Sequence, residues 1–167
     1  MAYKNSMKNI HVLVFILFFI VSCNSTKQIA NTDIAEVSIA KVEKTIVQLV
    51  NEYREKQGLK TLKVIDAITE VSEQHSQNMG IKKVAFGHDG FNKRYEALKK
   101  SMPRVGGAAE NVAFGNTSIQ QIVEGWIKSP GHRKNMEGPF NTTGVGVYRN
   151  KKGLVYYTQI FINQTDK

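Results

Sequence analysis

The spacing of apolar residues changes from helical to alternating along the chain, and this change constrains the fold more than any other feature. Four segments repeat apolar residues every three or four positions, which predicts helices with one buried face: 39 to Gly58, Asp66 to Gly80, Asn92 to Lys100, and Thr117 or Ser118 to Ser129. After Pro139, Val145 and Val147 alternate with glycines, and residues 154–161 are rich in β-branched and aromatic side chains. A turn at 150–153 joins these two runs into an antiparallel hairpin. The sequence therefore predicts an α+β domain.

Several residues in these segments are assigned to packing. His75 shares the apolar stripe of the second predicted helix, and Trp126 shares that of the fourth, so both are expected to face the core. Gly144 and Gly146 are expected to permit a close approach of another backbone to the hairpin. Residues 103–107, with one proline and two glycines, indicate a loop.

The single cysteine, Cys23, follows a segment typical of a secretory signal. Lys4 and Lys8 precede an apolar run at 12–21 that is too short to span a membrane. A secreted chain with no second cysteine has no disulfide framework, so it must be stabilised by burying apolar surface. The expected organisation is a signal peptide at 1–22, a polar tether at 23–37 and a single domain at 38–164.

The end of the signal, Ile20-Val21-Ser22-Cys23, resembles a bacterial lipoprotein lipobox. The resemblance implies that Cys23 becomes the acylated mature N-terminus, carrying chains such as palmitate. It further implies a membrane-anchored lipoprotein of the bacterial cell envelope that faces outside the cytoplasm. The alternative is an ordinary cleavable signal in which the cysteine is incidental.

The chain is basic, with a formal charge of +9 that falls to +7 without Lys4 and Lys8. Outside the cytoplasm the available polyanions are phospholipid headgroups, lipopolysaccharide and wall polymers, and no nucleic acid partner is expected. The basic residues are scattered rather than clustered with aromatic residues, which favours a solvated basic surface.

Three short segments combine turn-forming glycines with polar residues, at 86–90, 106–111 and 129–133. They contain His88, Glu110 and His132. Two imidazoles and a carboxylate can hold a catalytic Zn²⁺ with an open position, or perform general acid–base chemistry. The alternative is a polar network that holds the loops together. The chain has no His pair at the spacing of a zincin helix and no serine nucleophile elbow, and acylation of Cys23 would exclude a cysteine nucleophile.

The order of motifs in this chain resembles the bacterial branch of the CAP superfamily, also called SCP. The motifs are Phe-x-His, Ala-Glu-Asn-Val-Ala, Gly-Trp-x-x-Ser-Pro-Gly-His-Arg-x-Asn, Val-Gly-Val and Tyr-x-Thr-Gln-x-Phe, within Thr45 to Asn163. The resemblance implies an α-β-α sandwich, with three to four helices around a small antiparallel sheet. It also implies a large cleft lined in many members by two histidines and two acidic residues.

Carried over by position, the cleft histidines are His88 and His132 and the first acidic residue is Glu110. The second acidic position is Ser129 in this chain, so three of the four cleft groups are expected to remain. The glycine that usually precedes the first Glu is replaced by Ala109. Arg133 and Asn135 are expected to tie the turn after the helix break to the domain through hydrogen bonds.

The leading functional hypothesis is a non-enzymatic binding module for a lipid, a cell-wall component or a protein partner, with a cleft formed by His88, Glu110, His132 and Ser129. The alternative is a metal-dependent, peptidase-like hydrolase in which the two histidines and the glutamate are the candidates for catalysis. A third hypothesis is a structural envelope protein. A divalent metal such as Zn²⁺ would be held weakly by His88 and His132. The sequence leaves the oligomeric state open.

Overall fold

Helices form where the apolar stripes predicted them. The computed structural model describes residues 38–165, and its first four helices are α2 (Ile39–Lys56), α3 (Asp66–Gly80), α4 (Phe91–Ser101) and α5 (Ile119–Lys128). α5 begins with a capping box, in which the Ser118 hydroxyl accepts from the backbone N–H of Gln121 while the Gln121 side chain accepts from the Ser118 N–H.

A fifth helix, α6, occupies Pro130–Met136, where the sequence indicated a helix break followed by a turn. The break is present, since Ser129 ends α5 in an extended conformation. Pro130 then begins a new helix at its first position, where the missing N–H is not needed and the fixed φ suits the helix. His132 therefore projects from a short helix rather than from a turn.

The sheet has the order β1-β3-β4-β2 and consists of β1 (Lys63–Val64), β2 (Val105–Phe114), β3 (Thr142–Arg149) and β4 (Val155–Gln164). The predicted hairpin is confirmed as β3 and β4, which pair antiparallel. Two expectations were wrong. β1 pairs parallel with β3, so the sheet is mixed rather than antiparallel, and β2 begins at Val105, inside the segment expected to be a loop.

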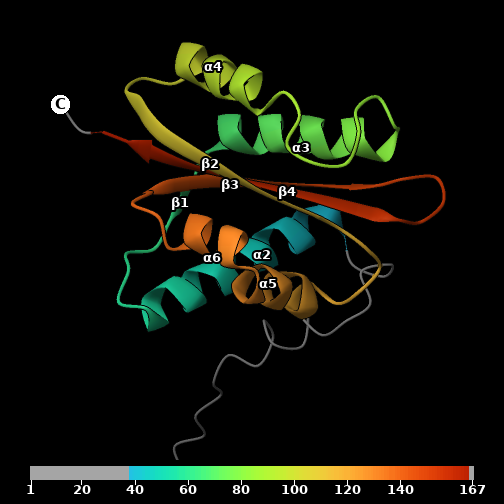
Figure 1. Cartoon of the computed structure of the whole chain (residues 1–167), viewed down its shortest axis with the longest axis horizontal. Coiled ribbons are helices and arrows are strands. Elements are labelled where there is room, and N and C mark those ends of the chain that lie inside the picture. Colours follow the sequence, from blue (N-terminus) through green and yellow to red (C-terminus); the bar gives the residue numbers. More distant parts are fainter. Residues whose placement is uncertain (1–37, 166–167) are drawn as a thin grey trace, which may run out of the picture.

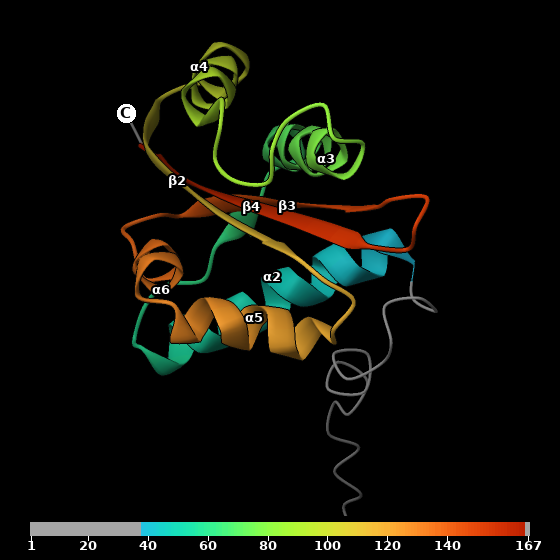
Figure 2. The ribbon, with the colours of Figure 1, turned by 45° about the vertical axis from the view of Figure 1, so that its right-hand side comes forward.

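Helices cover both faces of the sheet, as Figures 1 and 2 show: α3 and α4 lie on one face, and α2, α5 and α6 lie on the other. One buried cluster, which includes Ile46, Trp126 and Phe161, fills the space between the sheet and α2, α5 and α6. A smaller cluster with Ile68, Leu98 and Ile160 lies on the side of α3 and α4. The expected α-β-α sandwich of the α+β class is confirmed.

Two glycines of β3 allow α3 to lie directly on the strand. A Cβ atom on Gly144 would lie 2.2 Å from the backbone nitrogen of Thr69, and one on Gly146 would lie 1.9 Å from the backbone nitrogen of Glu73. Two buried serine hydroxyls of α3 cross the contact, since Ser72 donates to Gly144 O (3.2 Å) and Ser76 donates to Gly146 O (2.8 Å). The close approach expected at these glycines is confirmed.

Arg54, near the end of α2, binds the segment that connects α6 to β3. Its guanidinium donates to the carbonyl oxygens of Met136 (2.6 Å), Gly138 (3.1 Å) and Phe140 (3.0 Å), and also to that of Lys60 (2.9 Å). The residue is 2% exposed, and burial lowers the pKa of its guanidinium. One buried cation thus fixes where α6 ends and β3 begins.

The predicted signal, tether and acylation site at Cys23 fall in residues 1–37, outside the described residues. Among residues 38–165 no helix combines the length and the apolar character needed to cross a bilayer. The domain boundaries given for the sequence stay predictions.

Candidate functional site

Glu110 is the centre of the candidate site. Its side chain is 1% exposed, and it receives two charge-assisted hydrogen bonds from Arg94: Nε to Oε2 (2.8 Å) and Nη2 to Oε1 (2.7 Å). The His88 ring nitrogen Nδ1 lies 3.0 Å from the same Oε1. Burying a carboxylate requires such partners, because an unpaired charge in the interior is costly. The carboxylate of Glu110 is therefore held in place by a cation and an imidazole.

The position of β2 at the edge of the sheet brings residues from both helical layers to Glu110. Glu110 itself faces the side of α3 and α4, while the next residue, Asn111, faces α6. Asn135 of α6 donates to Glu110 O (3.1 Å) and to Asn111 Oδ1 (2.9 Å), and Asn111 donates to His132 O (3.1 Å). The expected tie through Asn135 is thus present, whereas the exposed Arg133 side chain makes no hydrogen bond within residues 38–165.

The contact with Glu110 sets how His88 is presented. A carboxylate only accepts hydrogen bonds, so neutral His88 carries its proton on Nδ1 and leaves Nε2 as an acceptor. The His88 side chain is 52% exposed, so this acceptor is accessible. An imidazole oriented by a carboxylate can accept a hydrogen bond from a ligand or bind a metal ion through its other nitrogen.

His75 of α3 lies beside the same carboxylate but is not accessible. Its prediction as a core histidine is confirmed, since it is 2% exposed and its Nε2 donates to Gly87 O (2.9 Å). Burial is the main cause of its lowered pKa, which favours the neutral imidazole. It lies 3.9 Å from Glu110 Oε1 and supports the loop that carries His88.

His132 lies within electrostatic reach of His88. Burial lowers the pKa of its imidazole, and the neighbouring His88 adds to the effect. The structure thus brings His88 and Glu110 into contact, and it ties His132 to the site through its backbone oxygen, which accepts from Asn111. Ser129 is different: it joins α5 to α6 and its hydroxyl does not cap α6, so no hydrogen bond connects it to this group within residues 38–165.

Arg94 was not singled out from the sequence, although one signal was available. Lys93 and Arg94 lie in the first turn of α4, where the helix dipole disfavours cations. Arg94 is used there for another purpose: besides Glu110 it donates to Asp89 O (2.9 Å), so it fixes the loop between α3 and α4.

The side chains at the site do not fit a closed metal centre. Both Glu110 oxygens are engaged by Arg94, and one of them also by His88. Within residues 38–165 no three His, Cys, Asp or Glu side chains are grouped as ligands of an ion. Two imidazoles remain, and the weak binding of a divalent ion by His88 and His132 stays a prediction.

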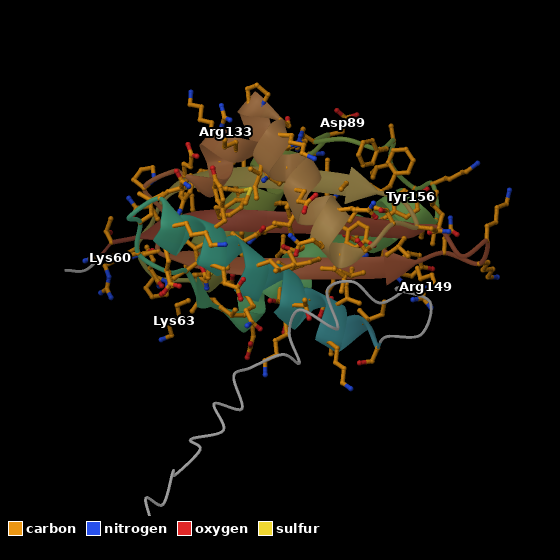
Figure 3. All side chains as sticks on the ribbon, turned by 90° about the horizontal axis from the view of Figure 1, so that it is seen from below. Lys60, Lys63, Asp89, Arg133, Arg149 and Tyr156 are labelled. Atoms are coloured by element: carbon orange, nitrogen blue, oxygen red, sulfur yellow. The ribbon has the colours of Figure 1, made fainter. Side chains whose placement is uncertain are left out.

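A hollow of about 480 Å³ lies beside the site. It is lined by Ala108 and Ala109 of β2, by Arg133 and Lys134 of α6, and by Phe140. Arg133 and Asp89 lie along the same side of the molecule in Figure 3. The small side chain of Ala109, in place of the usual glycine, therefore lines an open surface.

A larger groove, of about 880 Å³, lies at the other edge of the sheet between α2 and β1 and is remote from the histidines. Its wall includes Glu43, which accepts from the Val147 N–H (3.0 Å) and whose pKa is raised to about 7, chiefly by burial. The histidines and the buried carboxylate lie beside the smaller hollow at β2. The volume of a groove alone therefore does not identify the functional surface.

Comparison with known proteins agrees with this fold and these motifs. The model of the CAP family, the cysteine-rich secretory protein family, matches residues 47–161. The chain therefore belongs to the CAP family.

Bacterial proteins are among those similar to this chain. YkwD of Bacillus subtilis is 33% identical over 135 residues, which cover 80% of this chain and 51% of YkwD, so the chain spans about half the length of that relative. A solved extracellular protein with an SCP domain from Bacillus anthracis has a TM-score of 0.63 and 30% identity, over 74% of this chain and 41% of that one. A solved outer surface protein of Borrelia burgdorferi shares the fold, with a TM-score of 0.69 and 17% identity over 77% of this chain and 97% of that one.

Proposed function

We propose that this CAP domain is a non-enzymatic binding module, which holds a lipid, a cell-wall component or a protein partner at the surface formed by His88 and His132, with the buried Glu110 orienting His88 from behind. The observation that supports this most is the double hydrogen bond from Arg94 to the buried Glu110 carboxylate. A carboxylate so engaged orients His88 but is a poor general base, because both of its oxygens already accept hydrogen bonds from Arg94 and its side chain is 1% exposed. What remains accessible is the Nε2 acceptor of His88.

The alternative, a metal-dependent hydrolase, is less well supported by the same geometry. A catalytic Zn²⁺ usually has three protein ligands and one open position. The accessible donors are two imidazoles, and Glu110 would have to leave Arg94 to become a ligand or a base. The binding module is therefore the better description of this site.

A ligand-retention experiment tests the proposal. The purified chain is mixed with an extract of bacterial envelope lipids or with solubilised wall fragments, separated from free material by gel filtration, and examined by mass spectrometry. The expected result is an intact compound that stays with the wild-type protein. The double variant His88→Ala/His132→Ala is expected to retain at least about tenfold less, since each lost hydrogen bond costs about 1 kcal/mol.

The matched control is Lys63→Ala, because Lys63 is exposed on β1, the edge of the sheet opposite β2 (Figure 3), and should leave retention unchanged. Equal retention by the wild type and the double variant would show that the histidines are not the binding surface. Cleaved products that disappear in Glu110→Gln would instead establish the hydrolase.

We also propose that the domain is anchored to the bacterial cell envelope through an acylated Cys23, as the lipobox resemblance implies. The chain with Cys23→Ser is expected to move from the detergent phase to the aqueous phase in a Triton X-114 partition of cells that express it. Two or more acyl chains are needed for stable anchoring, so their loss should release the protein. Identical partition of the two chains would contradict the anchor, and Ser22→Ala, a conservative change beside the cysteine, is the control that should stay in the detergent phase.

A further inference from the structure

Three aromatic side chains form an exposed group where β2 ends. The rings of Phe86 and Phe114 meet edge to face with centroids 4.7 Å apart, and Phe114 stacks on Tyr156 at 6.0 Å. Phe86 is 47% exposed and Phe114 is 52% exposed. Large apolar side chains gathered on the surface mark an interaction site more often than scattered ones do.

This group continues across Gly80 to the hairpin turn. A Cβ on Gly80 would meet both Tyr148 and Tyr156, so the two tyrosines lie side by side against the end of α3. Beyond them is a hollow of about 350 Å³, lined by Ile81 and Lys82 at the end of α3 and by residues of the hairpin turn. Ile81 is 53% exposed, so apolar surface extends over the whole end.

The same end is strongly basic. It consists of segments 78–87, 114–118 and 148–156, and we call these three segments the basic-aromatic end. They contain five basic residues and no acidic one: Lys82, Lys83, Arg149, Lys151 and Lys152. These basic residues appear scattered in the sequence, because the three segments that contain them are far apart along the chain.

The chain enters the domain at this end. Ile39, the first residue of α2, lines a hollow together with Val147 and Tyr148, and Glu70 and Glu73 of α3 border the basic segments there. Residues 1–37, which include the apolar run at 12–21 and Cys23, therefore join the domain beside the basic-aromatic end. Figure 3 shows Arg149 and Tyr156 at one end of the molecule and Lys60 and Lys63 at the other.

We propose that the basic-aromatic end docks on the surface of an anionic phospholipid bilayer. Aromatic rings favour the boundary between headgroups and acyl chains, and lysines near an anionic surface each add about fivefold to binding. A bilayer interacts with the aromatic rings through its acyl chains and with the lysines through its headgroups, whereas a soluble polyanion interacts with the lysines alone. This proposal goes beyond the binding module at His88 and does not depend on it.

A fluorophore placed at this end tests the proposal on the full chain. Cys23→Ser removes the native thiol, and Ala85→Cys, an exposed position next to Phe86, receives a polarity-sensitive label. Lys60→Cys, labelled in the same way, reports from the opposite end. Vesicles of phosphatidylglycerol and phosphatidylcholine should raise and blue-shift the emission at position 85 but not at position 60. Vesicles of phosphatidylcholine alone should change neither.

Two variants separate the contributions of charge and apolar contact. Lys82 adopts a φ of 62°, which glycine takes more readily, so Lys82→Gly removes a charge without strain in the fold. Combined with Lys83→Gln, it should weaken vesicle binding about 30-fold. Phe114→Ser should also weaken binding, and circular dichroism checks that each variant is folded.

Three results would overturn the proposal. The first is an equal response at positions 60 and 85, which would mean that the N-terminal segment alone attaches the chain to vesicles. The second is no response at position 85. The third is binding that needs the lysines but is unchanged in Phe114→Ser, which would assign the end to a soluble polyanion such as a wall polymer.

Discussion

Replacing Gly146 by alanine is expected to lower the free energy of unfolding by about 3 kcal/mol or more. The new Cβ would lie 1.9 Å from the backbone nitrogen of Glu73, and backbone cannot rotate away as a flexible side chain can. α3 would have to move off β3, which would also break the hydrogen bond from the Ser76 hydroxyl to Gly146 O. Urea unfolding followed by the fluorescence of Trp126, the single buried tryptophan, measures the change.

Gly125→Ala is the matched control, with an effect of opposite sign. Gly125 lies inside α5, and a Cβ there meets nothing within 4 Å. Alanine should therefore raise the free energy of unfolding by about 0.5–1 kcal/mol through its higher helix propensity. Similar small effects of the two substitutions would contradict the direct contact between α3 and β3.

Arg54→Met is expected to lower the free energy of unfolding by about 3–5 kcal/mol. Methionine keeps the apolar stem but leaves four carbonyl oxygens, those of Lys60, Met136, Gly138 and Phe140, without their donor. The cost follows from burial, because these acceptors lose the guanidinium without gaining water. Thermal unfolding followed by circular dichroism measures the loss.

Arg133→Met makes the same exchange at an exposed arginine of α6, where the effect should stay within about 0.5 kcal/mol. If Arg54→Met were as mild as Arg133→Met, the carbonyl contacts of Arg54 would contribute little to stability. A large loss at Arg54 alone would show that one residue of α2 determines the path of the chain from α6 into β3.

The first four helices, α2 to α5, were predictable because their signals are local, whereas α6 was not predicted. Apolar stripes, the terminating residues Gly58 and Gly80, and the cap at Ser118 all lie within each segment. β2 was not predicted from the pattern of the sequence, and its first residues were expected to form a loop because Gly106 and Gly107 favour one when considered alone. Pairing with β4 from Val105 onward overrides that preference, and this partner strand comes only at the end of the domain, far away in the sequence.

The candidate site was predictable only in part, for a related reason. His88, Glu110 and His132 stand beside glycine or proline residues and match family motifs, so they could be named from the sequence. Arg94 has no such motif, and its role depends on how α4 lies over β2. The basic-aromatic end was concealed for the same reason, since Phe86, Phe114 and Tyr156 meet only in three dimensions.

The helix that carries Arg94 is also weakly attached. Leu98 is the one fully buried side chain of α4, whereas α3 contributes six buried residues, so local opening of α4 costs far less than global unfolding. Each such opening would carry Arg94 away from Glu110 and leave the carboxylate beside His75 and His88 without its cation. In native-state hydrogen exchange, the amides of α4 should therefore exchange ahead of those of α3, and the contact between Arg94 and Glu110 should break and re-form on the timescale of that local opening.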